Sequence, residues 1–263
     1  MGWTKVAIDD MESIWRGGFK RARAALGVTG FGLSVSDLPP NFDRTPPHAH
    51  VFDGQEEIYL AIEGSGWLDF DGERVPIDVT NAVRVGPGTH RSVVAGPDGI
   101  RVLIAGGTPG QPYTPFAPFE AGADEPSVAE LPGVHEAQTT ASDRDWTALR
   151  YDEMGPHTGH FKGVTMFPVR RKLGMSAFGV NVIDLEPGAD HPRHDHADSG
   201  QEEVYVVSVG NGVLELDGRR VPMDRHDMIR IGPEVERKWI PGEGGVSFVA
   251  FGAPPGAVYE PPN

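Results

Sequence analysis

Short apolar runs broken by turn residues dominate the chain. Four of them, "EIYLAI" (57–62), "GWLDFDG" (66–72), "NAVRVG" (81–86) and "RSVVAG" (91–96), are rich in β-branched and aromatic residues and end near Gly, Pro or Asp-Gly. Short strands separated by such turn signals are typical of a β-sandwich or a β-barrel. The best helical candidate, residues 12–26, is interrupted by two consecutive glycines, which disfavour a continuous helix. The pattern therefore predicts an all-β fold.

The same pattern occurs twice along the chain, which indicates an internal duplication. An offset of 146 residues aligns two stretches from the first histidine onward without a gap, and it pairs His48 with His194, His50 with His196, Glu57 with Glu203, Gly72 with Gly218 and Tyr113 with Tyr259. Upstream, an offset of 147 pairs residues 25–40 with 172–187. We therefore predict two tandem domains, 1–115 and 143–263. The unpaired residues 116–142, rich in Ala, Pro, Glu and Gly, are expected to form a linker.

Composition narrows the range of partners. The chain of 263 residues carries a formal charge of −15 and contains no cysteine. An acidic surface repels phosphate backbones and anionic lipid, so nucleic acid and membrane partners are not expected. A metal in this chain would have to be held by histidine and carboxylate side chains. The N-terminal residues have no apolar segment of a secretion signal, and we expect a cytoplasmic protein.

Each repeat carries a group of side chains suited to a metal ion. Alternation along a strand places His48 and His50 on one face, as two ligands of one metal require. Glu57 would lie on the returning strand, together with Tyr59 on the same face. Two histidines and one carboxylate with open coordination positions suit Fe(II), and also Mn, Ni, Co or Zn. The alternative is a hydrogen-bonded histidine pair without metal.

These motifs resemble a known family. The spacing His-x-His, then Glu57, then six residues, then Gly64 is similar to the first motif of the cupins, which are small double-stranded β-helix, or jelly-roll, barrels. The stretch around Pro87-Gly88 resembles their second motif. Because both halves carry the first motif, the chain resembles a bicupin, with two tandem barrels from a duplication. The resemblance implies metal ligands at His48, His50 and Glu57, and at His194, His196 and Glu203.

The second motif departs from the family pattern. The family places a histidine in this motif, but here that slot falls on Arg91, and His90 comes one residue early. The equivalent slot in the second half is Arg237, next to Glu236. Strand parity favours the arginines pointing inward, whereas a one-residue bulge would bring His90 to the site as a fourth ligand. Both possibilities stay open from the sequence.

Inward arginines have two interpretations. Arg91 and Arg237 could form salt bridges to Glu57 and Glu203, or they could clamp an anionic group of a substrate beside the metal. The second interpretation makes Arg91, Arg237 and the inward tyrosines, Tyr59 and Tyr205, candidate substrate-binding residues. Core packing is the alternative role of the tyrosines.

The sequence supports three hypotheses of function. A metal-dependent enzyme, oxygenase-like or an isomerase, would act on a small organic substrate inside a barrel. A non-catalytic barrel could instead bind a small molecule, with or without metal, and a structural barrel would serve association, with a homodimer one outcome. His191 and the "HTGH" stretch (157–160) are weaker candidates, expected in a loop and at an exposed position. The fold alone does not identify a substrate.

Overall fold

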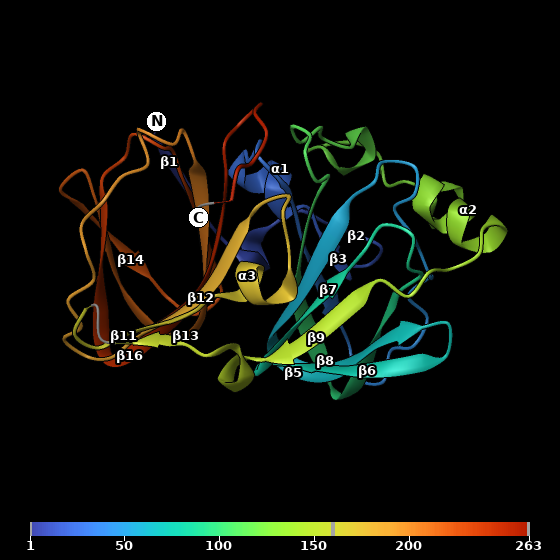
Figure 1. The fold of residues 1–263 in the computed structure, drawn as a ribbon, viewed down its shortest axis with the longest axis horizontal. Coiled ribbons are helices and arrows are strands. Elements are labelled where there is room, and N and C mark those ends of the chain that lie inside the picture. The colour runs from blue at the N-terminus through green and yellow to red at the C-terminus, as the bar shows by residue number, and fades with distance from the viewer. Residues whose placement is uncertain (1, 159–160, 262–263) are drawn as a thin grey trace.

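A computed structural model describes residues 2–158 and 161–261. Over these residues the chain forms two antiparallel sheets of eight strands, which lie side by side as two barrels (Figure 1). The all-β prediction is confirmed, and so is the pair of jelly-roll barrels. None of the described helices has the length and apolar character of a membrane span.

One sheet belongs mainly to the first repeat and the other to the second. The first contains β2 (Ser13–Ile14), β3 (Phe19–Lys20), β4 (Gly32–Leu38), β5 (Glu56–Phe70), β6 (Glu73–Asp78), β7 (Asn81–Val85), β8 (Ser92–Gly107) and β9 (Trp146–Arg150). The second contains β1 (Trp3–Ala7), β10 (His157–Thr158), β11 (Val164–Phe167), β12 (Gly179–Leu185), β13 (Glu202–Leu216), β14 (Arg219–Met223), β15 (Asp227–Ile231) and β16 (Arg237–Ala253).

The helices of the described chain are short. They are η1 (Ile8–Asp10), α1 (Ala22–Leu26), η2 (Ala117–Phe119), η3 (Val128–Glu130), α2 (Pro132–Thr139), η4 (Tyr151–Met154) and α3 (Val169–Leu173). In the stretch that looked most helical, only α1 is an α-helix. Gly17 adopts a positive φ of 91° in the tight turn between β2 and β3, a conformation that glycine tolerates best.

The two repeats exchange their first strands. β1 comes from the start of the chain but pairs with β15 in the second sheet, where Trp3 lies opposite Ile231. In the same way β9, which opens the second repeat, pairs with β7 in the first sheet, where Trp146 lies opposite Val85. Each sheet therefore crosses the domain limits expected from the repeat alone.

Long paired strands bend at equivalent glycines in the two barrels. In β5 the register with β8 shifts between Ala61 and Glu63 and again between Gly64 and Gly66. Gly64 has a φ of +69°, and a Cβ there would lie 2.1 Å from the carbonyl oxygen of Gly99. Gly210 repeats this approach against Gly245 at 2.2 Å. Bulges of this kind increase strand twist and curl each sheet into a barrel.

The predicted hairpin turns are present. Asp71 and Gly72 both have positive φ angles, 53° and 96°, and Asp217 and Gly218 repeat the pair with 47° and 78°. Two positive φ angles match the right-handed twist of the flanking strands. These turns join β5 to β6 and β13 to β14, so that Phe70 pairs with Glu73 and Leu216 with Arg219.

A shared core joins the barrels. Phe31 of the first repeat packs on Phe178 and Phe251 of the second, with ring centroids 5.8 and 5.9 Å apart. Two buried carboxylates bond across the same junction: Glu202 accepts hydrogen bonds from the backbone N–H groups of Thr29 and Gly30. Its counterpart Glu56 accepts from the backbone N–H groups at 176 and 177. Both carboxylates are satisfied, as buried charges require.

Candidate metal centres

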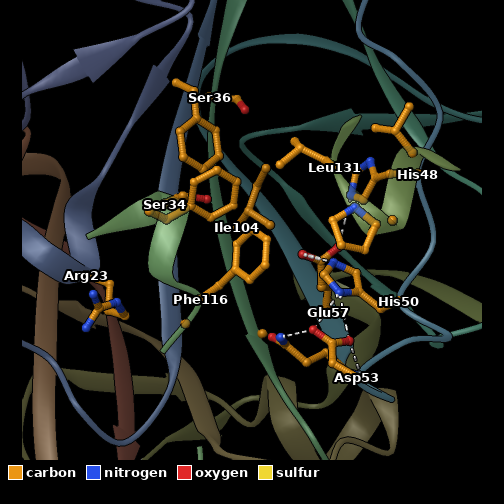
Figure 2. A pocket seen from close by; sticks show the side chains of 18 of the residues that line it. Arg23, Ser34, Ser36, His48, His50, Asp53, Glu57, Ile104, Phe116 and Leu131 are labelled. Atoms are coloured by element: carbon orange, nitrogen blue, oxygen red, sulfur yellow. Dashed lines mark hydrogen bonds and ion pairs between the residues drawn. The ribbon is translucent and has the colours of Figure 1, made fainter. Parts of the chain in front are cut away.

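The first cluster forms where the connection between β4 and β5 meets the start of β8. His48 lies in the connection between β4 and β5 and pairs with Arg91 in an isolated antiparallel bridge. His50 follows on the same face, and Glu57 projects from β5 toward both imidazoles (Figure 2). One ligand atom from each of the three residues lies within 4.8 Å of the other two. The structure thus brings together three side chains that the spacing predicted would converge.

Hydrogen bonds orient the histidine rings of this cluster. The Nδ1 atom of His50 lies 3.0 Å from Oδ1 of Asp53, and its Nε2 atom lies 3.2 Å from Oε1 of Glu57. The Nε2 atom of His48 lies 3.6 Å from Oε2 of the same carboxylate. A carboxylate on the far nitrogen fixes the ring and raises its basicity, as is common for metal-bound histidine. The donor set therefore fits a divalent metal at the Nε2 side of both rings.

Glu57 is held as a carboxylate by a buried arginine. Arg91 is fully buried, and its Nη2 and Nε atoms lie 2.7 and 3.1 Å from Oε2 of Glu57. The Tyr59 hydroxyl donates to the same oxygen at 2.6 Å. Burial alone would raise the pKa of Glu57, but the charge of Arg91 and that of His50 outweigh burial and hold it well below its usual range. Oε2 thereby accepts from Arg91 and Tyr59, and Oε1 remains directed at His50.

The two histidines respond differently to this environment. Burial and the neighbouring Arg91 charge lower the pKa of His48, so its imidazole is neutral and able to bind a metal. Burial would also lower the pKa of His50, but the charge of Glu57 and the hydrogen bond to Asp53 raise it. A metal at His50 would therefore compete with a proton.

The second cluster repeats the arrangement. Nε2 of His196 lies 3.2 Å from Oε1 of Glu203, and Nε2 of His194 lies 3.9 Å from Oε2. Arg237 and the Tyr205 hydroxyl bond Oε2 at 2.8 and 2.6 Å. Burial opposes ionisation of Glu203, yet the hydrogen bond from His196 and the charge of Arg237 lower its pKa to about 2. The described part of the chain thus contains two equivalent candidate metal groups.

The structure does not bring His90 to the first cluster. Its Nδ1 atom faces Asp71 of the hairpin at 3.4 Å, because strand parity turns it away from the side on which Arg91 points inward. No bulge reverses this parity at the start of β8, and the ladder from Ser92 onward is regular opposite Asp69 and Leu68. The side chain of His90 therefore lies outside the group formed by His48, His50 and Glu57. Glu236 at the equivalent position of the second half is exposed and pairs with Arg193 at 3.1 Å.

The candidate substrate-binding residues lie behind the carboxylates rather than in front of them. Arg91 and Arg237 are fully buried and donate to Glu57 and Glu203 and to backbone carbonyls of Thr89 and Val235. Tyr59 and Tyr205 are also buried and donate to the same carboxylates. These contacts agree with the salt-bridge interpretation, in which the four side chains support the ligand carboxylates, and a role in substrate binding stays a prediction.

The first cluster opens onto a cavity of about 200 Å³, here called the chamber. His48, His50 and Glu57 form one side of it, and Figure 2 shows Ile104 and Phe116 across from them, with Arg23 at the far end. Most of the remaining wall is apolar, with contributions from Trp15, Phe19, Leu33, Phe52, Val93, Phe119, Val128, Leu131 and Val134. Such a site is concave, largely apolar and supplied with a few polar groups, as small-molecule sites are.

Residues 116–134, expected to be part of a linker, form one wall of the chamber, and this segment is here called the cover. The cover, which includes η2, η3 and the start of α2, contributes six of the lining side chains, and the carbonyl of Gly133 accepts a hydrogen bond from the backbone N–H of Ala49. Arg21, only 2% exposed, fastens the cover through hydrogen bonds to the carbonyls of Pro118, Ala123 and Asp124. Trp15 adds a bond to the carbonyl of Pro126.

Sequence reasoning missed Asp53 and the cover. Asp53 stands three residues after His50 in a turn, and a carboxylate at that spacing from a candidate ligand is a signal that was readable. The cover contains phenylalanines at 116 and 119 and leucine at 131, which are unusual in a solvated linker. That signal identifies a segment that packs on something, though not its partner.

The weaker histidine candidates lie apart from the ligand sets. His191 is 6% exposed and stands beside His194, with ring centroids 5.7 Å apart, but it is not one of the clustered ligands. Burial, followed by the charge of His194, lowers its pKa to about 4. In the "HTGH" stretch, His157 is exposed on β10, and His160 lies outside the described residues.

Comparison with solved structures shows the same architecture. The chain is similar to protein Ylba from E. coli (16% identity, TM-score 0.64, 98% of this chain and 93% of the other). It is also similar to the oxalate decarboxylase of Lactobacillus farciminis (14%, 0.66, 97% and 87%). A mutant of the salicylate 1,2-dioxygenase of Pseudoaminobacter salicylatoxidans matches with 14% identity and a TM-score of 0.58 over 85% and 70%.

Comparisons of the sequence find no match. No protein-family model matches the chain, and no curated protein matches it. At identities of 13–16% the structural matches establish the fold rather than the chemistry. These structures are cupin-fold proteins, and the duplicated barrels and His-His-Glu groups agree with them. The chain is a bicupin in fold, as its two repeated motifs predicted.

Proposed function

We propose that the first barrel is the active site of a metal-dependent, oxygenase-like enzyme that acts on a small organic substrate. The observation that carries this proposal is the position of His48, His50 and Glu57 on the wall of the chamber. A metal with open coordination positions would supply Lewis acidity or a place for O₂ to bind. Two of the structural matches carry the names of enzymes with small substrates, an oxalate decarboxylase and a salicylate 1,2-dioxygenase.

The protein's own groups would hold the ligands and exclude water. His48, His50 and Glu57 would bind the metal, and Asp53 would keep the His50 ring turned toward it. Arg91 and Tyr59 keep Glu57 ionised and fix its orientation. The cover and the apolar wall exclude water from the chamber, which strengthens electrostatic interactions inside it. We propose Fe as the metal, with Mn, Ni and Zn as the other ions suited to this donor set.

One observation favours a second candidate function. Glu57 and Glu203 are each compensated by an arginine, so both clusters satisfy their charge without a metal. A metal-free barrel that binds a small molecule without turnover would use the same chamber. The two functions differ in whether metal binds to the full chain with useful affinity.

Elemental analysis of the untagged full chain, after loading with Fe, Mn, Ni or Zn, tests the proposal. We expect His48→Ala and His194→Ala each to remove one of two bound metals, and His157→Ala, at an exposed position, to remove neither. Oxygen uptake with a panel of small organic compounds should disappear with His48→Ala and persist with His157→Ala. A chain that binds none of these metals would overturn the enzyme proposal and favour the metal-free barrel.

A further inference from the structure

Building on the proposed function, we infer that the chamber takes a single-ring aromatic compound with one oxygen-bearing group facing His48, His50 and Glu57. Small dicarboxylates are excluded from it. The size, the wall and the charge of the chamber each support this choice.

The volume fits one ring. The chamber holds about 200 Å³, and an apolar cavity of about 150 Å³ is known to accommodate benzene. One ring with a small substituent therefore fills it, and a fused two-ring system exceeds it unless the cover moves. A compact ligand that fills the space regains the dispersion contacts that an empty cavity lacks.

The wall presents flat apolar surfaces away from the metal ligands. Phe116 packs edge-on against Phe119, with centroids 5.2 Å apart, and lies 6.1 Å from Phe52. Ile104 lies across from the histidines in Figure 2, whereas Leu131 lies beside His48. Aromatic rings gain specifically from edge-to-face neighbours, beyond the area they bury. The polar edge of a ligand would thus face the histidines, and its ring would face the phenylalanines.

The positive charges at the chamber are already paired. Arg91 lies behind Glu57 and is fully buried. Arg21 pairs with Glu12 at 2.9 Å and with the carbonyls of the cover. Arg23, at the far end, pairs with Glu120 of the cover at 2.5 Å. A second carboxylate in the chamber would have to displace one of these partners or stay unpaired among apolar groups, and both are unfavourable.

The cover makes the selection stringent because it is bonded in place over the chamber. Its hydrogen bonds to Arg21 and Trp15 fix Phe116, Phe119 and Leu131 over the chamber. A ligand with a second charged group would need the cover to stay open, at the expense of these bonds. Leu131 is the position at which a larger side chain would fill the chamber without changing the barrel wall.

Calorimetric titration of the zinc-loaded full chain tests the inference without turnover. We expect phenol and benzoate to bind, and oxalate and succinate not to bind. Leu131→Trp should weaken the two ring compounds by about tenfold or more. The matched control Leu131→Met keeps the volume and should bind as the wild type does. Because Leu131 lies on the cover, the barrel should stay folded, which the bound zinc content would verify.

The outcomes separate this inference from the proposed function. Binding of oxalate or succinate as tight as that of phenol would overturn the inference, and so would ring binding unchanged in Leu131→Trp. If the ring compounds bind but no oxygen uptake follows with iron, the ligand class stands and the oxygenase proposal fails. If uptake occurs only with dicarboxylates, the oxygenase stands and the ligand class fails.

Discussion

The two barrels share one framework and differ in what fills it. In both, two histidines and a glutamate converge, and a buried arginine and tyrosine hold the glutamate. In the first barrel Val93 leaves room for the chamber. In the second, the equivalent residue is Trp239, fully buried and stacked on Phe248 with centroids 4.7 Å apart. The two repeats therefore share the candidate metal framework, and the side chains around it determine the free space.

The surroundings of the ligands differ as well. His50 is hydrogen-bonded to the carboxylate of Asp53. The equivalent residue in the second barrel is Ser199, whose hydroxyl donates to the backbone carbonyl of His196. The cover packs over the first cluster and has no repeat equivalent in the sequence. The side chain of His196 is accordingly more exposed, at 27%, than that of its counterpart His50, at 16%, whereas His194 and His48 are similar at 30% and 26%. The comparison separates the ligand geometry, which both barrels share, from the covered chamber of the first barrel.

The arginines give the largest expected effect and test the common part. Arg91→Met and Arg237→Met each leave a buried carboxylate without its partner, which should cost about 3–5 kcal/mol of unfolding free energy in the metal-free protein. Urea denaturation followed by circular dichroism measures this. The double variants Arg91→Met/Glu57→Gln and Arg237→Met/Glu203→Gln should regain much of the loss. Unequal losses in the two barrels would break the symmetry that we assign to the framework.

Exchange of the interior residues tests the difference. Trp239→Val should destabilise the second barrel by about 3 kcal/mol, because it leaves a large cavity. Val93→Trp places the same side chain into the existing chamber and should cost less than about 1 kcal/mol, below the usual penalty of overpacking. Both values come from denaturant titrations of the full chain. Similar losses for the two variants would show that the chamber is not available space.

Asp53, which is hydrogen-bonded to His50, is expected to have a moderate effect on metal affinity. Asp53→Ala should weaken metal binding at the first cluster by about 10–100-fold, as loss of such partners does. Ser199→Ala is the matched change in the second barrel and should leave metal affinity unchanged. Competition with a chelator in variants that retain only one cluster measures each constant. An equal loss in both would assign Asp53 a general structural role.

A contact between the two barrels is expected to give the smallest effect, on the pH dependence of stability. His226 of the second repeat lies 3.0 Å from Nη1 of Arg101 of the first. Burial, and then the charges of Arg101 and Arg225, lower its pKa below its ordinary value of 6.5. The folded state thus favours neutral His226, so its contribution is complete above pH 6.5 and declines as the pH falls below that value. The stability of His226→Asn, which also tolerates the positive φ of 71°, should depend less on pH between 7.5 and 5.5.

Much of the candidate site was predictable because it depends on local patterns. Alternation along a strand placed His48 beside His50, and turned Arg91 inward and His90 outward, once the strand itself was recognised. The hairpin at Asp71-Gly72 fixes the pairing of β5, which carries Glu57, with β6. Strand parity alone does not show whether a bulge reverses the directions of Arg91 and His90, because a bulge depends on pairing with a distant strand.

The sequence by itself determined the duplication, the all-β character and the convergence of each histidine pair on a glutamate, because these follow from residue spacing within one repeat. Only the tertiary structure decided that β1 and β9 exchange between the sheets, that Arg21 fastens residues 116–134 over the first barrel, and that Trp239 fills the second. These features depend on contacts between residues that are far apart in the chain. A pattern within one segment records that its apolar side chains must be buried, but not against which surface.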